Sequence, residues 1–228
     1  MNKIKFLYRK VYQKNPILFI RKFYNTFFPN AFLFKNKNDI LQNDTFDWMK
    51  STNQRSHENY KLIKKHEYSL IKEINNTINK NEKILDICCN QGRFIFELKR
   101  LGFISLYGFD IMEKAISHLK SNDNYDKNII NVELSLAQDY FKDKPNNFYD
   151  WAITYSATIE LIHPEFDIFK TLSQKIKKGL IFVLNEKEHT YPRFYRYLIK
   201  RNGFNIVKIK PIFENNDFIN LFLCIKKT

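Results

Sequence analysis

The chain has 228 residues, of which 44% are hydrophobic and 16% aromatic. That is enough apolar surface for one sizeable folded core, and it excludes a wholly disordered chain. The three cysteines form no CxxC motif and no paired Cys/His spacing, so neither a zinc ribbon nor a disulfide framework organises the fold. A reducing cytoplasmic location is therefore expected. No apolar run approaches the roughly 20 residues that span a bilayer, so the sequence predicts no transmembrane helix.

The net charge of +14 is concentrated near the N-terminus, where residues 1–38 hold nine Lys or Arg and no acid. Such an excess is typical of proteins that contact nucleic acid or an anionic membrane. Lys, Asn, Ile, Phe and Tyr are all abundant, whereas there are only 5 Gly and 6 Pro. An A/T-rich genome imposes this bias whatever the function, which weakens the argument from charge alone.

Residues 1–38 are predicted to form one or two short basic helices interrupted by Pro16 and Pro29. Apolar residues recur there at helical spacing, namely Ile4, Leu7, Tyr8, Val11 and Tyr12. Three interpretations stay open for this aromatic-rich arm. It packs on the main domain or on a second subunit of a homodimer, it lies on an anionic membrane, or it binds RNA.

Residues 39–55 are polar and are interpreted as a linker, so that residues 1–55 form the arm and residues 56–228 the main domain. A leading helix is predicted from Ser56, a plausible N-cap, to about Ile78.

Beyond residue 82 the pattern alternates between strands and helices, which indicates an α/β fold with a parallel, doubly wound sheet covered on both faces. The last two strands are predicted to form an antiparallel hairpin around residues 214–218. The predicted strands are 83–88, 105–109, 131–134, 150–155, 179–184, 205–213 and 219–226, and the predicted helices are 93–101, 113–120, 166–176 and 192–202.

Ligands of doubly wound sheets bind at the carboxyl ends of the strands, which makes the first strand-to-helix turn the place to look for a site. Here it reads Ile84-Leu85-Asp86-Ile87-Cys88-Cys89-Asn90-Gln91-Gly92-Arg93-Phe94. This turn resembles that of the class I S-adenosylmethionine-dependent methyltransferases, in particular a bacterial branch acting on small molecules and glycans. The resemblance runs from about residue 83 to residue 228. It implies a Rossmann-like seven-stranded sheet and S-adenosylmethionine as cofactor, with Asp86, Cys88, Asn90 and Gly92 in contact with it. Cys88 stands where the family usually has glycine.

A second acid, Asp110, ends the next predicted strand about twenty residues further on. A carboxylate there can accept both ribose hydroxyls of a nucleoside, and the adjacent Ile111 is included in the predicted cofactor site. NAD-binding proteins share this spacing, so these two elements alone leave dehydrogenase and methyltransferase open.

Two further segments favour the methyltransferase. Residues 135–139 resemble the segment that edges the adenine, which implies cofactor contacts from Ala137 and Gln138, although the acid often found at the position of Leu136 is missing. Residues 148–164 resemble the family's fourth strand and the loop that follows it. This implies a cofactor contact from Thr154 and a substrate contact from Tyr155.

Methyl transfer to a hydroxyl needs no metal but benefits from a base with a pKa near neutrality, which points to histidine. His163 on the loop after the fourth strand is the first candidate and His189 the second, with Glu160 orienting either. The stretch after the fifth strand also resembles the same branch, and it implies that Glu186 and Arg193 face the substrate.

The resemblance favours O-methylation of a sugar or related small molecule in surface glycan biosynthesis, with the basic arm (residues 1–38) in peripheral contact with a membrane. RNA methylation is the rival enzyme activity, although the Asn/Asp-Pro-Pro-Tyr/Phe signature of base methyltransferases is absent at residues 154–157. A non-catalytic binding module is the rival from another class, because Cys88 and Leu161 depart from the family pattern.

Overall fold

A computed structural model of the chain describes residues 16–28, 62–156, 158–187, 190–214 and 216–227. Its centre is a seven-stranded sheet in the order β3-β2-β1-β4-β5-β7-β6. The pairings among β1 to β5 are parallel, whereas β7 is antiparallel to both β5 and β6. This confirms the predicted fold class. The strands are β1 (Ile84–Ile87), β2 (Leu106–Asp110), β3 (Ile130–Leu134), β4 (Tyr149–Tyr155), β5 (Ile176–Asn185), β6 (Phe204–Phe213) and β7 (Asn216–Lys226).

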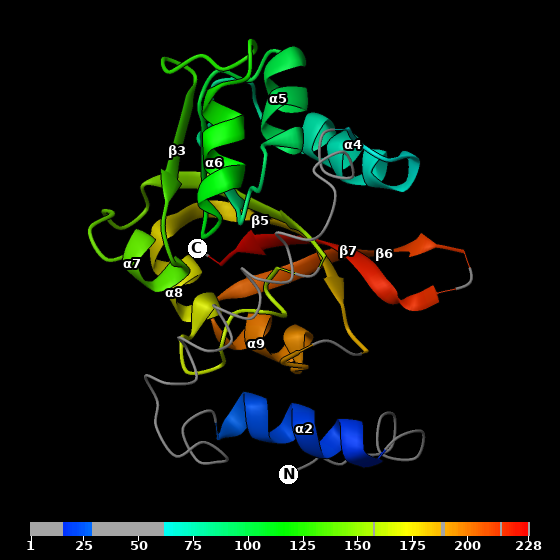
Figure 1. Cartoon of the computed structure of the whole chain (residues 1–228). Helices are drawn as coiled ribbons and strands as arrows, with labels where there is room; N and C mark the ends of the chain where they lie inside the picture. The colour runs from blue at the N-terminus through cyan, green and yellow to red at the C-terminus, as the bar shows by residue number, and fades with distance from the viewer. Residues whose placement is uncertain (1–15, 29–61, 157, 188–189, 215, 228) are drawn as a thin grey trace.

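Helices cover both faces of the sheet (Figure 1). One face carries α4 (Tyr68–Thr77), α5 (Arg93–Arg100) and α6 (Glu113–Lys120), and the other carries α7 (Ala137–Tyr140), α8 (Ile168–Lys175) and α9 (Tyr195–Arg201). Two apolar clusters fill the two layers, and the alternation of β1 divides its side chains between them. Leu85 and Ile87 belong to the α8/α9 side, and Ile84 to the α4/α5/α6 side. Because it is buried on both faces, β1 reads as a continuous apolar run apart from Asp86.

Some predicted boundaries differ from the structure. The strand predicted at 179–184 begins earlier, at Ile176, which directly follows α8 and pairs with Tyr149 of β4. Pairing with a neighbouring strand outweighs the local helical pattern here. The α4 helix begins at Tyr68 and is preceded by a short 3-10 turn, η2 (Lys65–Glu67), instead of running from Ser56. Residues 29–61, which include the predicted linker, lie outside the described residues.

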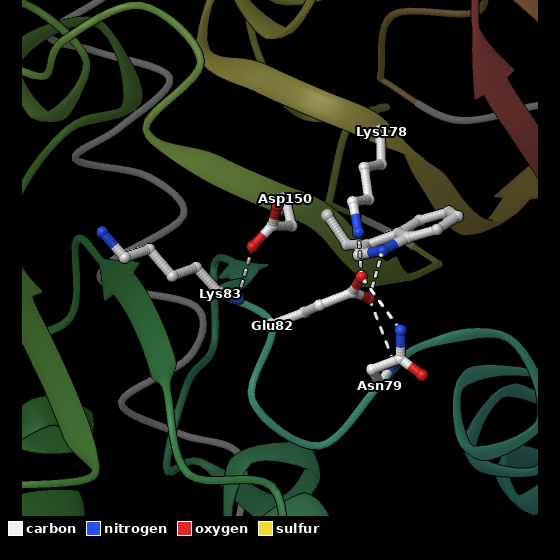
Figure 2. Close-up of polar contacts among 6 residues, drawn as sticks. Asn79, Glu82, Lys83, Asp150 and Lys178 are labelled. Atoms are coloured by element: carbon white, nitrogen blue, oxygen red, sulfur yellow. Dashed lines mark hydrogen bonds and ion pairs between the residues drawn. The ribbon is translucent and has the colours of Figure 1, made fainter.

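Polar contacts clamp the sheet at the edge where its parallel strands begin (Figure 2). The buried Glu82 carboxylate accepts hydrogen bonds from Trp151 Nε1 at 2.9 Å and from the N–H of Asn79 at 3.0 Å, and it pairs with the ammonium of Lys178. Burial alone raises the pKa of Glu82, but the bonds from Lys178, Asn79 and Trp151 lower it overall. The Glu82 clamp thus joins β1, β4 and β5 at the edge opposite their carboxyl ends.

The described part of the basic arm is α2 (Pro16–Phe27), which lies beyond α9 in Figure 1. Asn25 Nδ2 donates to the carbonyl of Pro192 at 3.1 Å, and Thr26 Oγ1 accepts the N–H of Phe194 at 3.0 Å. The ring of Phe27 also packs against Phe194. Residues 16–28 therefore pack on the main domain, as one of the three interpretations expects. None of the described helices is long and apolar enough to cross a membrane.

Candidate active site

The predicted cofactor residues gather where three neighbouring strands end. In the sheet β1 lies between β2 and β4, with Ile87 paired to Phe109 and Asp86 paired to Ile153. The carboxyl ends of these parallel strands therefore lie along one edge. That edge brings together Asp86, Asp110 and Thr154, which are far apart in the sequence.

The turn after β1 has an unusual backbone. Cys88, Asn90 and Gly92 have φ angles of 54°, 51° and 77°, so three alternate residues are left-handed. Asn tolerates this region and Gly has no Cβ to strain it, but at Cys88 the side chain carries a steric cost. At Gly92 a Cβ would also come within 2.6 Å of Leu119 Cδ1. The turn thus has a backbone conformation that favours glycine, with a cysteine at its first left-handed position.

Asp110 holds this turn in place. Its buried carboxylate accepts the N–H of Asn90 and the N–H of Met112, each at 2.9 Å. Burial raises the pKa of Asp110, and these hydrogen bonds oppose that rise. Each carboxylate oxygen has more than one lone pair, so both retain capacity for a further donor such as a ribose hydroxyl.

Asp86 is buried beside it, and its Oδ2 atom has no hydrogen-bond partner among the described residues. Burial is the main reason that the pKa of Asp86 rises to about 8, and the charge of Asp110 adds to it, whereas the nearby Arg93 lowers it. A buried carboxyl oxygen without a donor is costly unless a ligand supplies one. Asp86 and Asp110 together suit a ligand that carries both a cationic amino group and vicinal hydroxyls, as S-adenosylmethionine does.

The segment predicted to edge the adenine follows β3 and lies against Asp110. The N–H of Ser135 donates to the carbonyl of Asp110 at 2.9 Å, and α7 then begins at Ala137. Ala137 and Gln138 are both half-buried, as is Ile111 next to Asp110. The structure thus brings these three residues close to Asp110, and their contacts with the cofactor stay predictions.

Two residues at the end of β4 differ in their surroundings. Thr154 is buried, and its hydroxyl lies 3.3 Å from the carbonyl of Ile87, which ties β4 to β1. The ring of Tyr155 stacks on Phe94 with centroids 5.7 Å apart, and the His66 ring lies at 6.0 Å. Burial raises the pKa of the Tyr155 hydroxyl. These rings form an aromatic wall beside the cofactor turn.

Sequence reasoning missed the ion pair that braces this wall. Glu67 Oε1 lies 2.7 Å from the Arg93 guanidinium, and its Oε2 accepts the N–H of Lys64 at 2.8 Å. Both side chains are largely shielded from water. Arg93 belongs to the recognisable turn, but no sequence pattern marks Glu67, on a 3-10 turn before α4, as its partner.

Glu160 and Arg193 are fully or almost fully buried and engaged with backbone groups. The Glu160 carboxylate accepts the N–H of Asn185 at 2.6 Å and the N–H of Thr158 at 3.1 Å. Burial raises the pKa of Glu160 against the opposing effect of those bonds. Arg193 donates to the carbonyls of Ile159 and Ile162. Both side chains thus fix the loop after β4, and their predicted catalytic and substrate roles compete with these contacts.

His163 is buried on the same loop, with its ring edge-on to Tyr191 at 5.0 Å between centroids. Its Nδ1 atom accepts the N–H of Glu165 at 3.3 Å. While Nδ1 accepts this bond, the neutral ring holds its proton on Nε2. The same Nδ1 lies 3.8 Å from the Glu165 carboxylate, which would favour a proton on Nδ1 instead. A base acting through Nε2 needs that second tautomer. The hydrogen bond from Glu165 therefore favours a positioning role for His163 over the predicted role as base.

Glu186, a predicted substrate contact, has both carboxylate oxygens engaged by the Arg196 guanidinium, at 2.7 and 2.6 Å. His189, the second candidate base, lies outside the described residues. Among the residues that the structure does describe, no group of three or more His, Cys, Asp or Glu side chains could hold a metal ion.

Known proteins resemble this chain in fold. No curated protein sequence matches the chain. Among solved structures, it is similar to a magnesium protoporphyrin IX methyltransferase from Synechocystis PCC 6803 with bound S-adenosylmethionine, at 14% identity and a TM-score of 0.57, over 92% of this chain and 95% of that one. It is also similar to an S-adenosylmethionine-dependent methyltransferase from Mesorhizobium loti (14% identity, TM-score 0.55, 71% and 97% covered).

The cyclase SpnF has the same fold, with 12% identity and a TM-score of 0.56 over 70% of this chain and 80% of that one. At such identities the structural likeness shows the fold alone. The sequence itself matches a family described as "Methyltransferase domain" over residues 55–192, more than half of the chain. On that match, the protein belongs to the methyltransferase-domain family.

Proposed function

We propose that the protein binds S-adenosylmethionine at the ends of β1 and β2 and transfers its methyl group to a hydroxyl acceptor. The observation that carries this proposal is the pair of buried carboxyl groups of Asp86 and Asp110, one of which has an oxygen without a hydrogen-bond donor. When bound, the cofactor supplies an activated methyl group on a sulfonium. The task left to the protein is to align the acceptor and exclude water.

Each part of the site has a task in this proposal. Asp110 accepts the ribose hydroxyls while it keeps its bonds to the turn, and Asp86 receives the positively charged amino group. Ala137 and Gln138 border the adenine. The aromatic wall of Tyr155 and Phe94 shields the transfer from water on the acceptor side.

We further propose that the acceptor is a sugar or a related small molecule of surface glycan biosynthesis. The support is the resemblance of residues 83–228 to a branch of that kind, together with the absence of a base-methylation signature at residues 154–157. Such a hydroxyl needs a base, and His189, the second candidate from the sequence, takes that role in this proposal. Glu186 and Arg193 then act indirectly, by shaping the loops around the acceptor.

A non-catalytic binding module is the second candidate, and the left-handed Cys88 is the observation that favours it. The resemblance implies a glycine here, and a Cβ group hinders the approach of a cofactor to the backbone. SpnF, whose name describes a cyclase, shows that the fold is not confined to proteins named as methyltransferases.

Two measurements on the full chain test these proposals. Calorimetry with S-adenosylmethionine measures binding, and mass spectrometry then measures methyl transfer to a panel of nucleotide sugars, lipid-linked glycans and RNA. Binding with turnover on a sugar acceptor supports both proposals. Turnover on RNA alone would show that the acceptor is RNA and not a sugar. Binding without turnover on any acceptor supports the module. Absence of binding in a folded protein contradicts the cofactor assignment.

A further inference from the structure

The helix α2 presents a continuous apolar stripe to solvent. Ile17, Ile20, Tyr24 and Phe28 are between 39% and 71% exposed. Their spacing of three or four residues places all four along one side of the helix. A single exposed apolar side chain is ordinary, but three along one side of a helix of 12 residues, with a fourth directly after its end, are not.

The opposite side of α2 contacts the main domain through both polar and apolar side chains. Lys22 and Thr26 are buried, and the Lys22 ammonium donates to the backbone carbonyl of Glu186. Thr26 and Asn25 bond to the segment 192–194. Leu18 is buried on the same side, and the rings of Phe19 and Phe27 pack against Phe194. Rotating the stripe inward would break all of these hydrogen bonds, so the stripe is held facing outward.

The charge of the surrounding sequence indicates which kind of partner binds the stripe. Residues 1–38 carry nine basic side chains and no acid. We propose that the outer face of α2 docks on an anionic lipid bilayer, with the helix lying in the plane of the interface. Isoleucine and aromatic side chains then enter the headgroup boundary. Arg21 and Lys22 bond to the main domain, so the other basic residues of 1–38 supply the contacts with anionic lipid. Twelve residues make about 18 Å of helix, which suits this position and not a span.

A second copy of the chain is the rival occupant. Pairing two α2 stripes would bring two segments without any acidic residue against each other, and like charges at an interface oppose association. RNA is a poorer fit, because two of the four side chains are aliphatic and cannot stack on bases. The bilayer is the one partner that satisfies the apolar stripe and the positive charge together.

Docking would place the segment after β5 close to the membrane, since α2 bonds to the backbone of Glu186, Pro192 and Phe194. The inference does not depend on methyl transfer. A protein that fails to bind S-adenosylmethionine could still dock, and one that binds it could fail to dock, so the two proposals can fail separately.

The experiment is co-sedimentation of the full chain with vesicles of phosphatidylcholine alone and of phosphatidylcholine mixed with phosphatidylglycerol. The test variant is Ile17→Ser combined with Ile20→Ser. The matched control is Val207→Ser combined with Ile209→Ser, which removes two aliphatic side chains from β6 that are 57% and 38% exposed. Thermal unfolding checks that every variant is folded.

We expect binding only to the mixed vesicles, and we expect it to weaken as salt rises, because the Debye length falls from about 10 Å at 0.1 M to about 3 Å at 1 M. The α2 variant should bind the mixed vesicles at least about tenfold more weakly than the wild type does, whereas the β6 control should bind like the wild type. Equal binding of both variants, or no binding to either vesicle, would overturn the proposal. A wild-type dimer that the α2 variant converts to monomer would assign the stripe to self-association instead.

Discussion

Asp86 and Asp110 stand at the ends of neighbouring strands, yet only Asp110 has its carboxylate oxygens satisfied by backbone N–H groups, those of Asn90 and Met112. The Oδ2 atom of Asp86 has no donor in the described structure. Burial, with the Asp110 charge adding to it, raises the pKa of Asp86 to about 8. Asp110 thus stabilises the turn through its hydrogen bonds, whereas Asp86 has an oxygen to which a ligand could donate.

The raised pKa of Asp86 predicts a dependence of stability on pH. In the folded state this pKa is about 8, above the value of about 3.9 of an unfolded chain. The folded protein therefore keeps a proton that the unfolded chain releases. The resulting stabilisation is complete below about pH 4, falls as pH rises, and is lost above about pH 8.

Asp86→Asn removes this titration with little change of shape. Urea unfolding of the wild type and the variant between about pH 5 and about pH 8 should show a smaller decline in the variant, by up to about 1.4 kcal/mol per pH unit. Parallel pH profiles would contradict the assignment, because all other titrating groups are common to the two proteins.

Replacing Asp110 should weaken cofactor binding. Asp110→Asn loses charge-assisted bonds to the ribose and loosens its hold on the N–H groups of Asn90 and Met112. We expect calorimetry to show a loss of about 2–4 kcal/mol in S-adenosylmethionine binding. Asp167→Asn is the matched control, because that carboxylate also accepts a backbone N–H, from Lys170 at 3.0 Å, but at the start of α8. An unchanged dissociation constant in Asp110→Asn would remove this residue from the site.

Glycine at position 88 should relieve the strained turn. The φ of 54° costs a residue with a Cβ about 1 kcal/mol that glycine does not incur. Cys88→Gly should therefore be about 1 kcal/mol more stable to urea than Cys88→Ala, which also lacks the thiol but keeps the Cβ. Cofactor affinity should be equal to that of the wild type or tighter. Loss of binding in a folded Cys88→Gly protein would show that the thiol has acquired a role of its own.

His163→Asn tests whether His163 is the base. The Asn carbonyl can accept the N–H of Glu165 as Nδ1 does, so we expect kcat to change only a few-fold. Removing a general base typically lowers the rate by about 10²–10⁴-fold. A fall of that size, with unchanged cofactor affinity and loss of a rate dependence near pH 6.5, would restore His163 as base and require the loop to rearrange.

Much of the fold is predictable because its strands are short apolar runs between turn residues. The hairpin of β6 and β7 and the parallel strands β1 to β5 follow from that pattern and are confirmed. The start of β5 at Ile176 is not predictable locally, since it is decided by pairing with Tyr149 on a distant strand. The short helix α7 is likewise too brief for a periodic signal.

Within the site, the acids at Asp86 and Asp110 are found from spacing alone, because strand ends in a parallel sheet share an edge. Contacts between distant segments are a different matter. Asn25 meets Pro192 across 167 positions, and Glu67 meets Arg93 from an irregular turn. Neither pair has a period or a motif, so only the folded chain brings them together.

The Glu82 clamp has a consequence for how this protein could be altered. The strained backbone of Cys88 and the donorless oxygen of Asp86 both lower stability, and both belong to the edge where ligand is expected. The clamp, drawn in Figure 2, adds stabilising contacts at the other end of the same strands. A variant intended to survive heating would therefore be modified around Asn79 and Lys178, where added stability does not compete with activity.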